Sequence, residues 1–382
     1  MSCVVTAITA TEPFIAAPGI RVQEVSSYQA FLDLEPVWTR VVEEAATGSP
    51  FLEFAWARTW WECFGKGGVL HVLVVWAGDE PIAIAPLMAT TIRMWGLSVR
   101  SLGFLYNSHV PRTDFIISAR PDDAYRSIWN HLAQDRRWDL LQLFQLPESS
   151  PTMGEIRHLA EQEGYSTGTW ASGSSPYVPL DTSWNEYHDS LAAKHRSNLR
   201  NRFKRLNQIG PVEFETISTS VGLPEAVEEA LQLEAAAWKG EQGTAIACAS
   251  DVRAFYGEFA KRAVERGWLR LNFLRAGDKR VACDYSLAYG NQVFLLKVGY
   301  DPAFSAFAPS NLLLSMALKN AFADGLGRYD FLGEFAEWKR SWAKESIAHE
   351  WLFVFSKGLK GRLLHSIKFG VIPLFKRLTR RK

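Results

Sequence analysis

One stretch of the chain, from Trp268 to Trp342, alternates apolar runs with turn signals in an order that few folds accommodate. The apolar runs 268–274 and 281–289 are separated by Ala276-Gly277-Asp278-Lys279, and Gly290-Asn291 introduces a third run, 293–298. Gly-Asp and Gly-Asn pairs between apolar runs are typical of β-hairpins. The sequence therefore predicts a platform of three antiparallel strands.

A helix is predicted directly after this platform. Pro309-Ser310-Asn311 precedes the apolar run 312–323, and Gly325 follows it. Pro in the first turn, Ser or Asn as a cap, and Gly near the end are the usual boundaries of a helix. The run 329–332 then predicts another strand. A strand that leads into a helix N-terminus presents free backbone N–H groups and the positive end of the helix dipole, which suits a pyrophosphate.

Several segments of this stretch resemble the CelD/BcsL-type acyltransferases of the GCN5-related N-acetyltransferase (GNAT) superfamily, which are related to Fem-type aminoacyl transferases. They are Leu296–Phe304, Pro309–Leu314, Tyr329–Gly333 and Glu337–Trp342, and the resemblance extends back to Trp238-Lys239-Gly240 and to the basic segment Lys194–Arg205. It implies a GNAT fold with acetyl-CoA as co-substrate, although no glycine lies between Tyr300 and Gly325, where a Gly-rich phosphate loop is usual. The expected donor-binding residues are Phe307, Ala308, Ser310, Asn311 and Leu312. The resemblance also implies acceptor contacts by Trp238, Lys239, Glu334, Trp338 and Lys339.

Three residues of the platform are candidates for catalysis. If Tyr289 pairs with Gln292 across a two-residue turn, Asp284 lies directly opposite Lys297, among small residues. Asp284 would then deprotonate or orient the acceptor, Lys297 would stabilise negative charge, and Tyr300 would protonate the departing thiolate. The alternative is an ion pair across the strands that adds little beyond solubility.

An internal repeat predicts how the whole chain is organised. Residues 76–85, Trp-Ala-Gly-Asp-Glu-Pro-Ile-Ala-Ile-Ala, align with residues 275–284, Arg-Ala-Gly-Asp-Lys-Arg-Val-Ala-Cys-Asp. Either two Gly-Asp hairpins coincide by chance, or the chain is an α/β (α+β) protein with two tandem GNAT-like domains, each a mixed, mostly antiparallel sheet flanked by helices. The predicted parts are a flexible leader (1–19), a degenerate GNAT-like domain (20–171), a Ser/Gly-rich linker (172–176), an acyltransferase domain (177–356) and a basic amphipathic tail (357–382).

The composition limits the class of protein and the cellular compartment that we expect. With 382 residues, 47% of them hydrophobic, the chain has enough material for packed cores. Its four cysteines form no CxxC pair, so we expect neither a disulfide framework nor a structural zinc site, and the reducing cytoplasm fits best. No secretory signal and no membrane span is predicted.

Nine of the 42 Lys and Arg residues lie in 351–382, which has no Asp or Glu. This tail either packs on the last domain or contacts an anionic membrane surface.

The function we expect is acetyl transfer from acetyl-CoA to an amine or hydroxyl of a sugar or cell-envelope precursor, by direct attack on the thioester. The identity of the acceptor rests on the resemblance alone. Two alternatives are an aminoacyl transferase that uses aminoacyl-tRNA, gripped by Lys194–Arg205, and a non-catalytic accessory protein of polysaccharide synthesis. Nucleic acid is the less favoured partner, because no recognised nucleic-acid-binding motif accompanies these bases.

Overall fold

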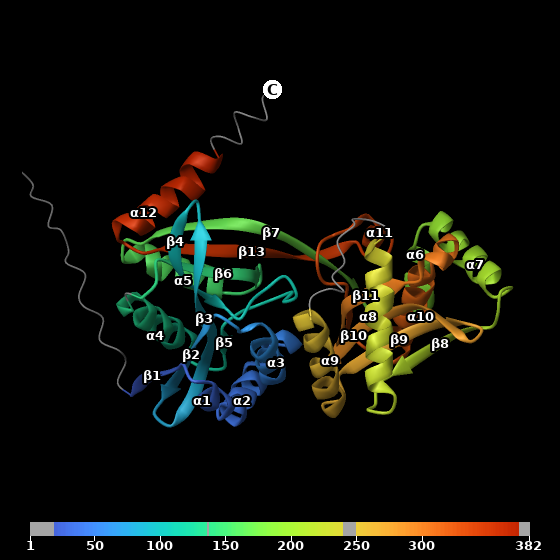
Figure 1. The fold of residues 1–382 in the computed structure, drawn as a ribbon, viewed down its shortest axis with the longest axis horizontal. Helices are drawn as coiled ribbons and strands as arrows, with labels where there is room; N and C mark the ends of the chain where they lie inside the picture. The colour runs from blue at the N-terminus through green and yellow to red at the C-terminus, as the bar shows by residue number, and fades with distance from the viewer. Residues whose placement is uncertain (1–18, 136, 240–249, 374–382) are drawn as a thin grey trace, which may run out of the picture.

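The computed structural model describes residues 19–135, 137–239 and 250–373, the last two residues of the second range by their backbone only. The first half of the chain contains three helices, four long strands, a short strand, and then alternating helices and strands (Figure 1). In order these are β1 (Ile20–Val25), α1 (Tyr28–Leu32), α2 (Glu35–Ala45), α3 (Phe54–Phe64), β2 (Val69–Ala77), β3 (Glu80–Met94), β4 (Leu97–Phe104), β5 (Ile116–Ile117), α4 (Pro121–Gln134), β6 (Leu140–Pro147), α5 (Thr152–Gln162) and β7 (Ser166–Pro179).

The second half repeats this order after two connecting helices. Its elements are α6 (Trp184–Ser190), α7 (Ala193–Leu206), β8 (Val212–Ile217), α8 (Leu223–Lys239), α9 (Ser250–Glu265), β9 (Leu269–Ala276), β10 (Lys279–Tyr289), β11 (Gln292–Tyr300), the 3₁₀ helix η3 (Pro302–Phe307), α10 (Pro309–Ala323), β12 (Arg328–Asp330), α11 (Glu337–Arg340) and β13 (Glu345–Phe355). A final helix, α12 (Leu359–His365), continues into a π-helical turn over Ser366–Val371.

The strands of both halves form one continuous sheet. Its order is β1-β2-β3-β4-β6-β13-β7-β12-β11-β10-β9-β8, with β5 attached to β3. In the first half three antiparallel pairings are followed by a parallel one between β4 and β6, and in the second half the parallel pair is β11 with β12. The predicted fold class, a tandem of mostly antiparallel α/β units, is confirmed.

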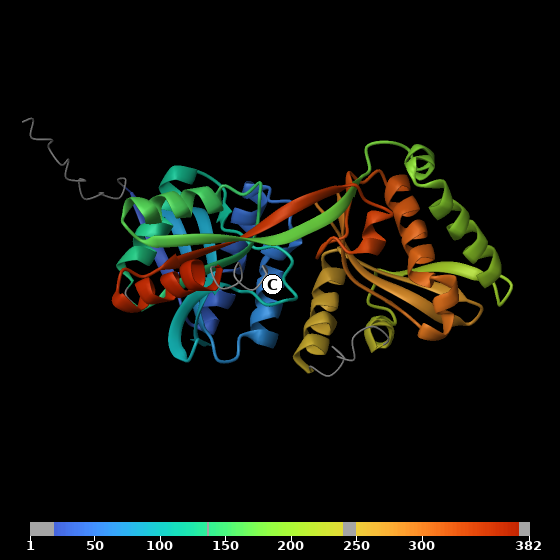
Figure 2. The same ribbon diagram turned by 90° about the horizontal axis from the view of Figure 1, so that it is seen from above.

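The two halves exchange their last strands. β7 ends the first half in sequence but pairs with β12 of the second half through residues 177–179. β13 ends the second half but pairs with β6 through residues 349–355. Between these ends β7 and β13 pair with each other and cross from one half to the other, as Figure 2 shows. The predicted linker 172–176 is therefore wrong, because these residues lie inside β7 and pair with β13.

The repeated Gly-Asp motif forms the same hairpin in both halves. Gly78 joins β2 to β3 with a φ of 63°, and Gly277 joins β9 to β10 with a φ of 61°. Positive φ angles of this kind are why glycine stands at both turns. The internal repeat thus corresponds to a repeated local structure at equivalent places in the two units.

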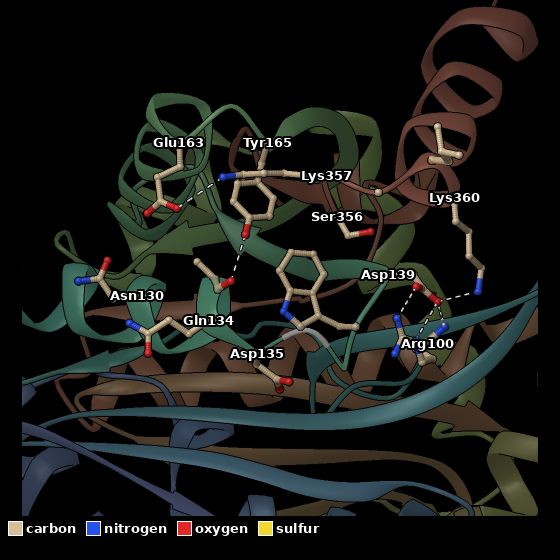
Figure 3. A pocket seen from close by; sticks show the side chains of 14 residues that line it. Arg100, Asn130, Gln134, Asp135, Asp139, Glu163, Tyr165, Ser356, Lys357 and Lys360 are labelled. Carbon is tan, nitrogen blue, oxygen red and sulfur yellow. Dashed lines mark hydrogen bonds and ion pairs between the residues drawn. The ribbon is translucent and has the colours of Figure 1, made fainter. Parts of the chain in front are cut away.

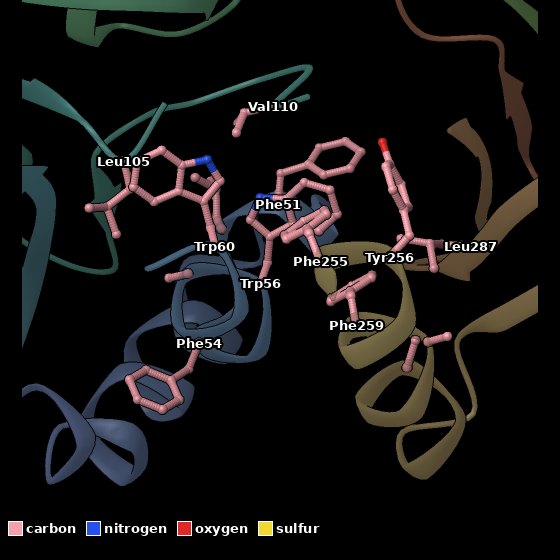
Figure 4. Close-up of a cluster of buried hydrophobic side chains, with 14 of the residues drawn as sticks. Phe51, Phe54, Trp56, Trp60, Leu105, Val110, Phe255, Tyr256, Phe259 and Leu287 are labelled. Carbon is pink, nitrogen blue, oxygen red and sulfur yellow. The ribbon is translucent and has the colours of Figure 1, made fainter. Parts of the chain in front are cut away.

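A shared apolar core joins the two halves in front of this sheet. Trp56 of α3 packs edge-on against Phe255 and Phe259 of α9, with ring centroids 5.0 and 4.8 Å apart (Figure 4). Phe51 meets Phe294 of β11 at 5.5 Å. All of these rings are buried. Residues of the first half therefore pack directly against the helices and the sheet of the second half.

The basic tail begins as a packed helix. Leu364 of α12 is fully buried in a small core with Phe353 and Phe355 of β13, whereas Leu359 and Leu363 are exposed. The predicted leader lies almost wholly outside the described residues, as do residues 374–382 of the tail. Among the helices in the described ranges, none combines the length and the apolar character that crossing a bilayer requires.

Candidate active site

A cavity of about 300 Å³ opens between the splayed strands of the second half. Its walls come from both sides of the sheet: Ala237 of α8 lies on one side, and Ser310 and Asn311 of α10 lie on the other. Asp284 of β10 and Tyr300 of β11 also line it. The cavity therefore passes through the plane of the sheet at the carboxyl end of β11.

Two irregularities of β11 create this opening. The parallel pairing with β12 covers only residues 292–294. From there to Tyr300 β11 has no partner on this edge, and the chain after β12 turns at Leu332, whose φ is 50°. On its other edge β11 contains a bulge, because Tyr285 pairs with Lys297 but Ser286 pairs with Leu295. The bulged strand bends away from its partner, as bulges next to functional sites commonly do.

Asp284 is the most unusual titratable group at this cavity. Its side chain is buried, and Asn272 Nδ2 and Ser286 Oγ each donate a hydrogen bond of 2.8 Å to its Oδ1 atom. Its Oδ2 atom has no hydrogen-bond partner among the described residues. Burial raises the pKa of Asp284 to about 7, against the two hydrogen bonds that lower it. A carboxyl group with this pKa and one free oxygen beside a cavity can accept a proton near neutral pH.

The partners of Asp284 were not identified from the sequence. Asn272 in turn accepts a 2.7 Å hydrogen bond from Thr216 Oγ1, so a polar chain runs across β8, β9 and β10. The available signal was Asn272 itself, an amide within the apolar run 269–274. Buried amides need partners, and the facing strand supplies one.

Lys297 does not face Asp284, so the predicted pair is wrong. The bulge moves Lys297 by one place, onto the opposite face of the sheet. There its Nζ lies 3.1 Å from Glu234 Oε1 of α8 and 5.4 Å from the centre of the Tyr256 ring. This position serves the contact between α8, α9 and the sheet, and not the cavity.

The start of α10 closes the cavity on the other side. Ala308 precedes the helix in the left-handed conformation, with a φ of 46°, and Pro309 is its first residue. The backbone N–H groups of Asn311 and Leu312 already donate to Ala308 O, and that of Ala308 donates to Ser305 O. These three amides, predicted to hold the donor, are thus engaged within the chain. As the second helical residue, Ser310 has no intrahelical acceptor for its N–H, and its buried hydroxyl lacks a partner among the described residues.

The other two residues predicted to bind the donor, Phe307 and Leu312, are not among those that line the cavity. Phe307 stacks under Arg205 of α7, whose guanidinium lies 5.2 Å from the ring centre. Leu312 is buried in the apolar core and does not line the cavity. The basic helix α7 therefore runs beside η3 and the start of α10, and its Lys194, Arg200 and Lys204 are exposed there.

The residues that the resemblance assigned to the acceptor divide into three groups. Trp338 lines the cavity, while Glu334 is exposed. Lys339 is buried and donates to Leu332 O at 2.5 Å and Phe331 O at 3.3 Å, so it holds the turn after β12. Burial lowers its pKa to about 8. The side chains of Trp238 and Lys239 lie outside the described residues.

A larger cavity, of about 790 Å³, lies in the first half between α4, α5 and α12 (Figure 3). Its charged groups are paired: Asp139 binds both Arg100 and Lys360, at 2.7 Å each. It shares no lining residue with the cavity at Asp284. Size alone therefore does not mark it as the site of chemistry.

The first half contains a counterpart of the active-site helix α10 that begins with acidic instead of neutral residues. Arg120 precedes α4 in the left-handed conformation, with a φ of 47°, and Pro121 is the first helical residue. The next two residues are Asp122 and Asp123, where α10 has Ser310 and Asn311. Two carboxylates at a helix N-terminus repel an anionic ligand. This half also has Ala85 at the place equivalent to Asp284.

Comparison with known proteins agrees with this geometry. The family model of the acetyltransferase (GNAT) domain matches residues 193–340, which include Asp284, Tyr300 and the start of α10. This segment is similar to GNAT-type acetyltransferase domains. No curated protein sequence matches the chain.

Solved structures show the fold of the whole chain. The crystal structure of FemX is 12% identical, with 86% of this chain and 98% of that chain covered and a TM-score of 0.59. The C-terminal DUF2156 domain of a putative lysylphosphatidylglycerol synthetase from Agrobacterium fabrum is 12% identical, with coverages of 87% and 95% and a TM-score of 0.52. L-PGS from Bacillus licheniformis has 12% identity, coverages of 89% and 96%, and a TM-score of 0.50. At this identity the similarity describes the fold only.

Proposed function

We propose that the GNAT-type domain of this chain transfers an acetyl group from acetyl-CoA to an amine or hydroxyl acceptor. The observation that carries this proposal is the position of Asp284, a buried carboxyl with one free oxygen at a cavity that ends on the N-terminus of α10. One end of such a cavity accepts a proton, and the other favours negative charge.

The proposed reaction is a direct displacement. Asp284 Oδ2 takes the proton of the acceptor N–H or O–H as the acceptor atom attacks the thioester carbonyl carbon. The carbon–sulfur bond then breaks, and the hydroxyl of Tyr300, which lines the same cavity, gives its proton to the departing sulfur. The products are the acetylated acceptor and free CoA. No Ser or Cys nucleophile is needed: Cys283 also lines the cavity, but its thiol donates to Ala230 O of α8.

The phosphates of CoA would lie between α10 and α7. Ser310 offers its hydroxyl and backbone N–H, and the exposed bases of α7 lie beside them. Within the described residues, no ion pair joins Arg200 or Arg202 to a carboxylate, so both remain available to a phosphate. Trp338 at the mouth of the cavity would then meet the acceptor.

For the acceptor we propose a sugar or another cell-envelope precursor, as the resemblance to CelD/BcsL-type acyltransferases implies. The second candidate donor is an aminoacyl-tRNA, which the FemX-like fold and the exposed bases of α7 favour. Binding to tRNA would weaken steeply as salt rises, because it depends on phosphate contacts. Binding of acetyl-CoA would depend less on salt.

Titration calorimetry with acetyl-CoA and with bulk tRNA tests the proposal. We expect saturable acetyl-CoA binding by the wild type and by Asp284→Asn, together with slow hydrolysis or transfer by the wild type that releases thiol. Binding of tRNA alone would instead establish aminoacyl transfer. Binding of neither would leave the accessory role in polysaccharide synthesis and overturn both enzymatic proposals.

We also propose that the protein is cytoplasmic and that its tail contacts the inner face of the membrane. Leu359 is 87% exposed and Leu363 49% exposed, on a helix that also carries Arg362. An exposed apolar edge flanked by bases suits an anionic bilayer. Sedimentation with phosphatidylglycerol vesicles should recover the wild type but not Leu359→Glu/Leu363→Glu. Equal recovery of both, or equal binding to uncharged vesicles, would contradict this contact.

A further inference from the structure

We propose that the first half of the molecule binds one divalent transition-metal ion, such as Zn²⁺, between Glu24, His71 and His131. These residues come from three elements, β1, β2 and α4. One potential ligand atom from each lies within 4.8 Å of the other two. The cluster shares no residue with the cavity at Asp284, and the acetyl-transfer proposal does not depend on it.

The spacing of the ligand atoms suits a tetrahedral ion. His71 Nδ1 lies 3.3 Å from Glu24 Oε1, and His131 Nε2 lies 3.2 Å from Glu24 Oε2. With zinc–ligand bonds of about 2.0–2.1 Å, neighbouring ligands of a tetrahedral site are about 3.3–3.4 Å apart. An ion can therefore enter with small side-chain movements. A water molecule would complete the fourth position.

The buried state of His71 points to a ligand independently. Its side chain is 5% exposed, and its Nε2 atom has no hydrogen-bond partner among the described residues. The nearest carboxylate to this atom is Asp135, with Oδ2 at 4.0 Å.

Metal binding would give each ring nitrogen of His71 a distinct role. With Nδ1 bound to the ion, the ring proton stays on Nε2 and points toward Asp135. A histidine that binds metal through one nitrogen and donates to a carboxylate through the other is the usual arrangement in metal sites.

Arg137 is the competing cation at this cluster. It donates to both oxygens of Glu24 at 3.0 Å and to Asp135 at 2.8 Å. Its side chain is 67% exposed, so it can swing into solvent when an ion takes Glu24. Because Arg137 and the ion compete for one carboxylate, removal of Arg137 should tighten metal binding.

The ion would fix the edge of the sheet. β1 is the outermost strand and pairs only with β2 among the described strands, while His131 belongs to α4, which packs over both. A bond from each element to one ion would tie the strand and the helix together. The expectation of no structural zinc site rested on local sequence patterns, and these three ligands, 47 and 60 residues apart, form none.

The test uses the full chain after chelator treatment. Calorimetry with Zn²⁺ should give one site per chain, Co²⁺ should develop the intense visible absorption of a tetrahedral site, and the Tm should rise by about 3 °C when free Zn²⁺ is a hundredfold above Kd. His131→Gln should lose the site, and Arg137→Gln should bind at least several-fold more tightly. His158→Gln, which removes an exposed histidine of α5, is the matched control and should bind as the wild type does.

Each outcome decides the proposal. Equal binding by the wild type and His131→Gln would overturn it, as would an octahedral, weakly absorbing Co²⁺ spectrum. His131 is partly exposed, so its replacement should leave the fold intact even if a change at the buried His71 does not. Circular dichroism of His131→Gln confirms that the variant tested is folded.

Discussion

Lys297 lies opposite Tyr285, and Asp284 lies opposite Val298. The reason is a bulge, where β11 has one residue more than β10 between the two stretches in which these strands pair. Counting back from the Tyr289–Gln292 turn gives the right partners as far as Ser286 and Leu295. Leu296 is then left unpaired, and every later residue is displaced by one. Since neighbouring residues of a strand point to opposite faces, this single residue separates the two charges by the thickness of the sheet.

The first prediction concerns Lys297→Met, which should affect stability and not chemistry. The substitution leaves Glu234, 3% exposed, without its cation. We expect a loss of about 2 kcal/mol in the free energy of unfolding, measured with urea, and a kcat within about twofold of the wild type. The double variant Lys297→Met/Glu234→Gln should regain much of the stability. A large fall in kcat at unchanged stability would return Lys297 to the active site.

Asp284→Asn should remove catalysis while donor binding survives. The amide oxygen can still accept from Asn272 and Ser286, so the local structure is kept. Loss of the base should lower kcat by about 10²–10⁴-fold, with the Kd for acetyl-CoA changed little. Ser286→Ala, which removes one of the two hydrogen bonds, is the control and should lower kcat far less. Wild-type activity should also rise with pH through about 7, where Asp284 loses its proton.

The same carboxyl should make the folded protein less stable as pH rises. Burial raises the folded-state pKa of Asp284 to about 7 from an ordinary value of 3.8, so between these values the folded chain holds a proton that the unfolded chain has lost. This contribution favours folding below pH 4 and is lost as pH approaches 7, by at most about 4 kcal/mol. The Tm of Asp284→Asn should therefore exceed that of the wild type at pH 8 and nearly equal it at pH 4. An equal difference at both pH values would contradict the raised pKa.

Gly299 should not tolerate a side chain. A Cβ atom at this position would lie 2.3 Å from the Glu234 backbone nitrogen of α8, so the helix must move away from β11. We expect Gly299→Ala to cost about 3 kcal/mol in urea unfolding and to widen the cavity. Gly257→Ala in α9, where a Cβ atom meets nothing within 4 Å, is the control and should stabilise the protein by about 1 kcal/mol. Similar effects of the two substitutions would show that α8 is not pressed against β11.

The proposed phosphate site at the start of α10 can be tested by exchanging the first-turn residues of α10 and α4. Ser310→Asp/Asn311→Asp gives α10 the first turn of α4, and two carboxylates there should weaken acetyl-CoA binding by at least about 100-fold. Calorimetry measures the change. The reverse change, Asp122→Ser/Asp123→Asn, should create no second site, because the first half has Ala85 at the place equivalent to Asp284. Unchanged affinity in the α10 variant would place the phosphates elsewhere.

The hairpins and helices were predictable because their signals are local. Gly277-Asp278 marks its turn and Pro309 begins its helix, both where the sequence placed them.

The failures have tertiary causes. Residues 172–176 have the composition of a loop, yet they form strand because β13 pairs with them along their length. The bulge at Leu296 leaves no trace in a run of apolar residues, so the register beyond it could not be counted from the turn. The position of Asp284 at the cavity was predicted, but its polar partners come from β9 and its own strand, and only the folded sheet brings Thr216 into that chain.

The crossing of β7 and β13 has a consequence for how the chain is made. The amino-terminal unit cannot complete its sheet until residues near 355 have left the ribosome, because its strand β6 pairs with β13. A premature stop near codon 340 would therefore damage the amino-terminal unit, more than 190 residues upstream of the lesion. Expression of either unit alone should yield an open sheet edge, and only co-expressed fragments that each carry their exchanged strand can reassemble the molecule.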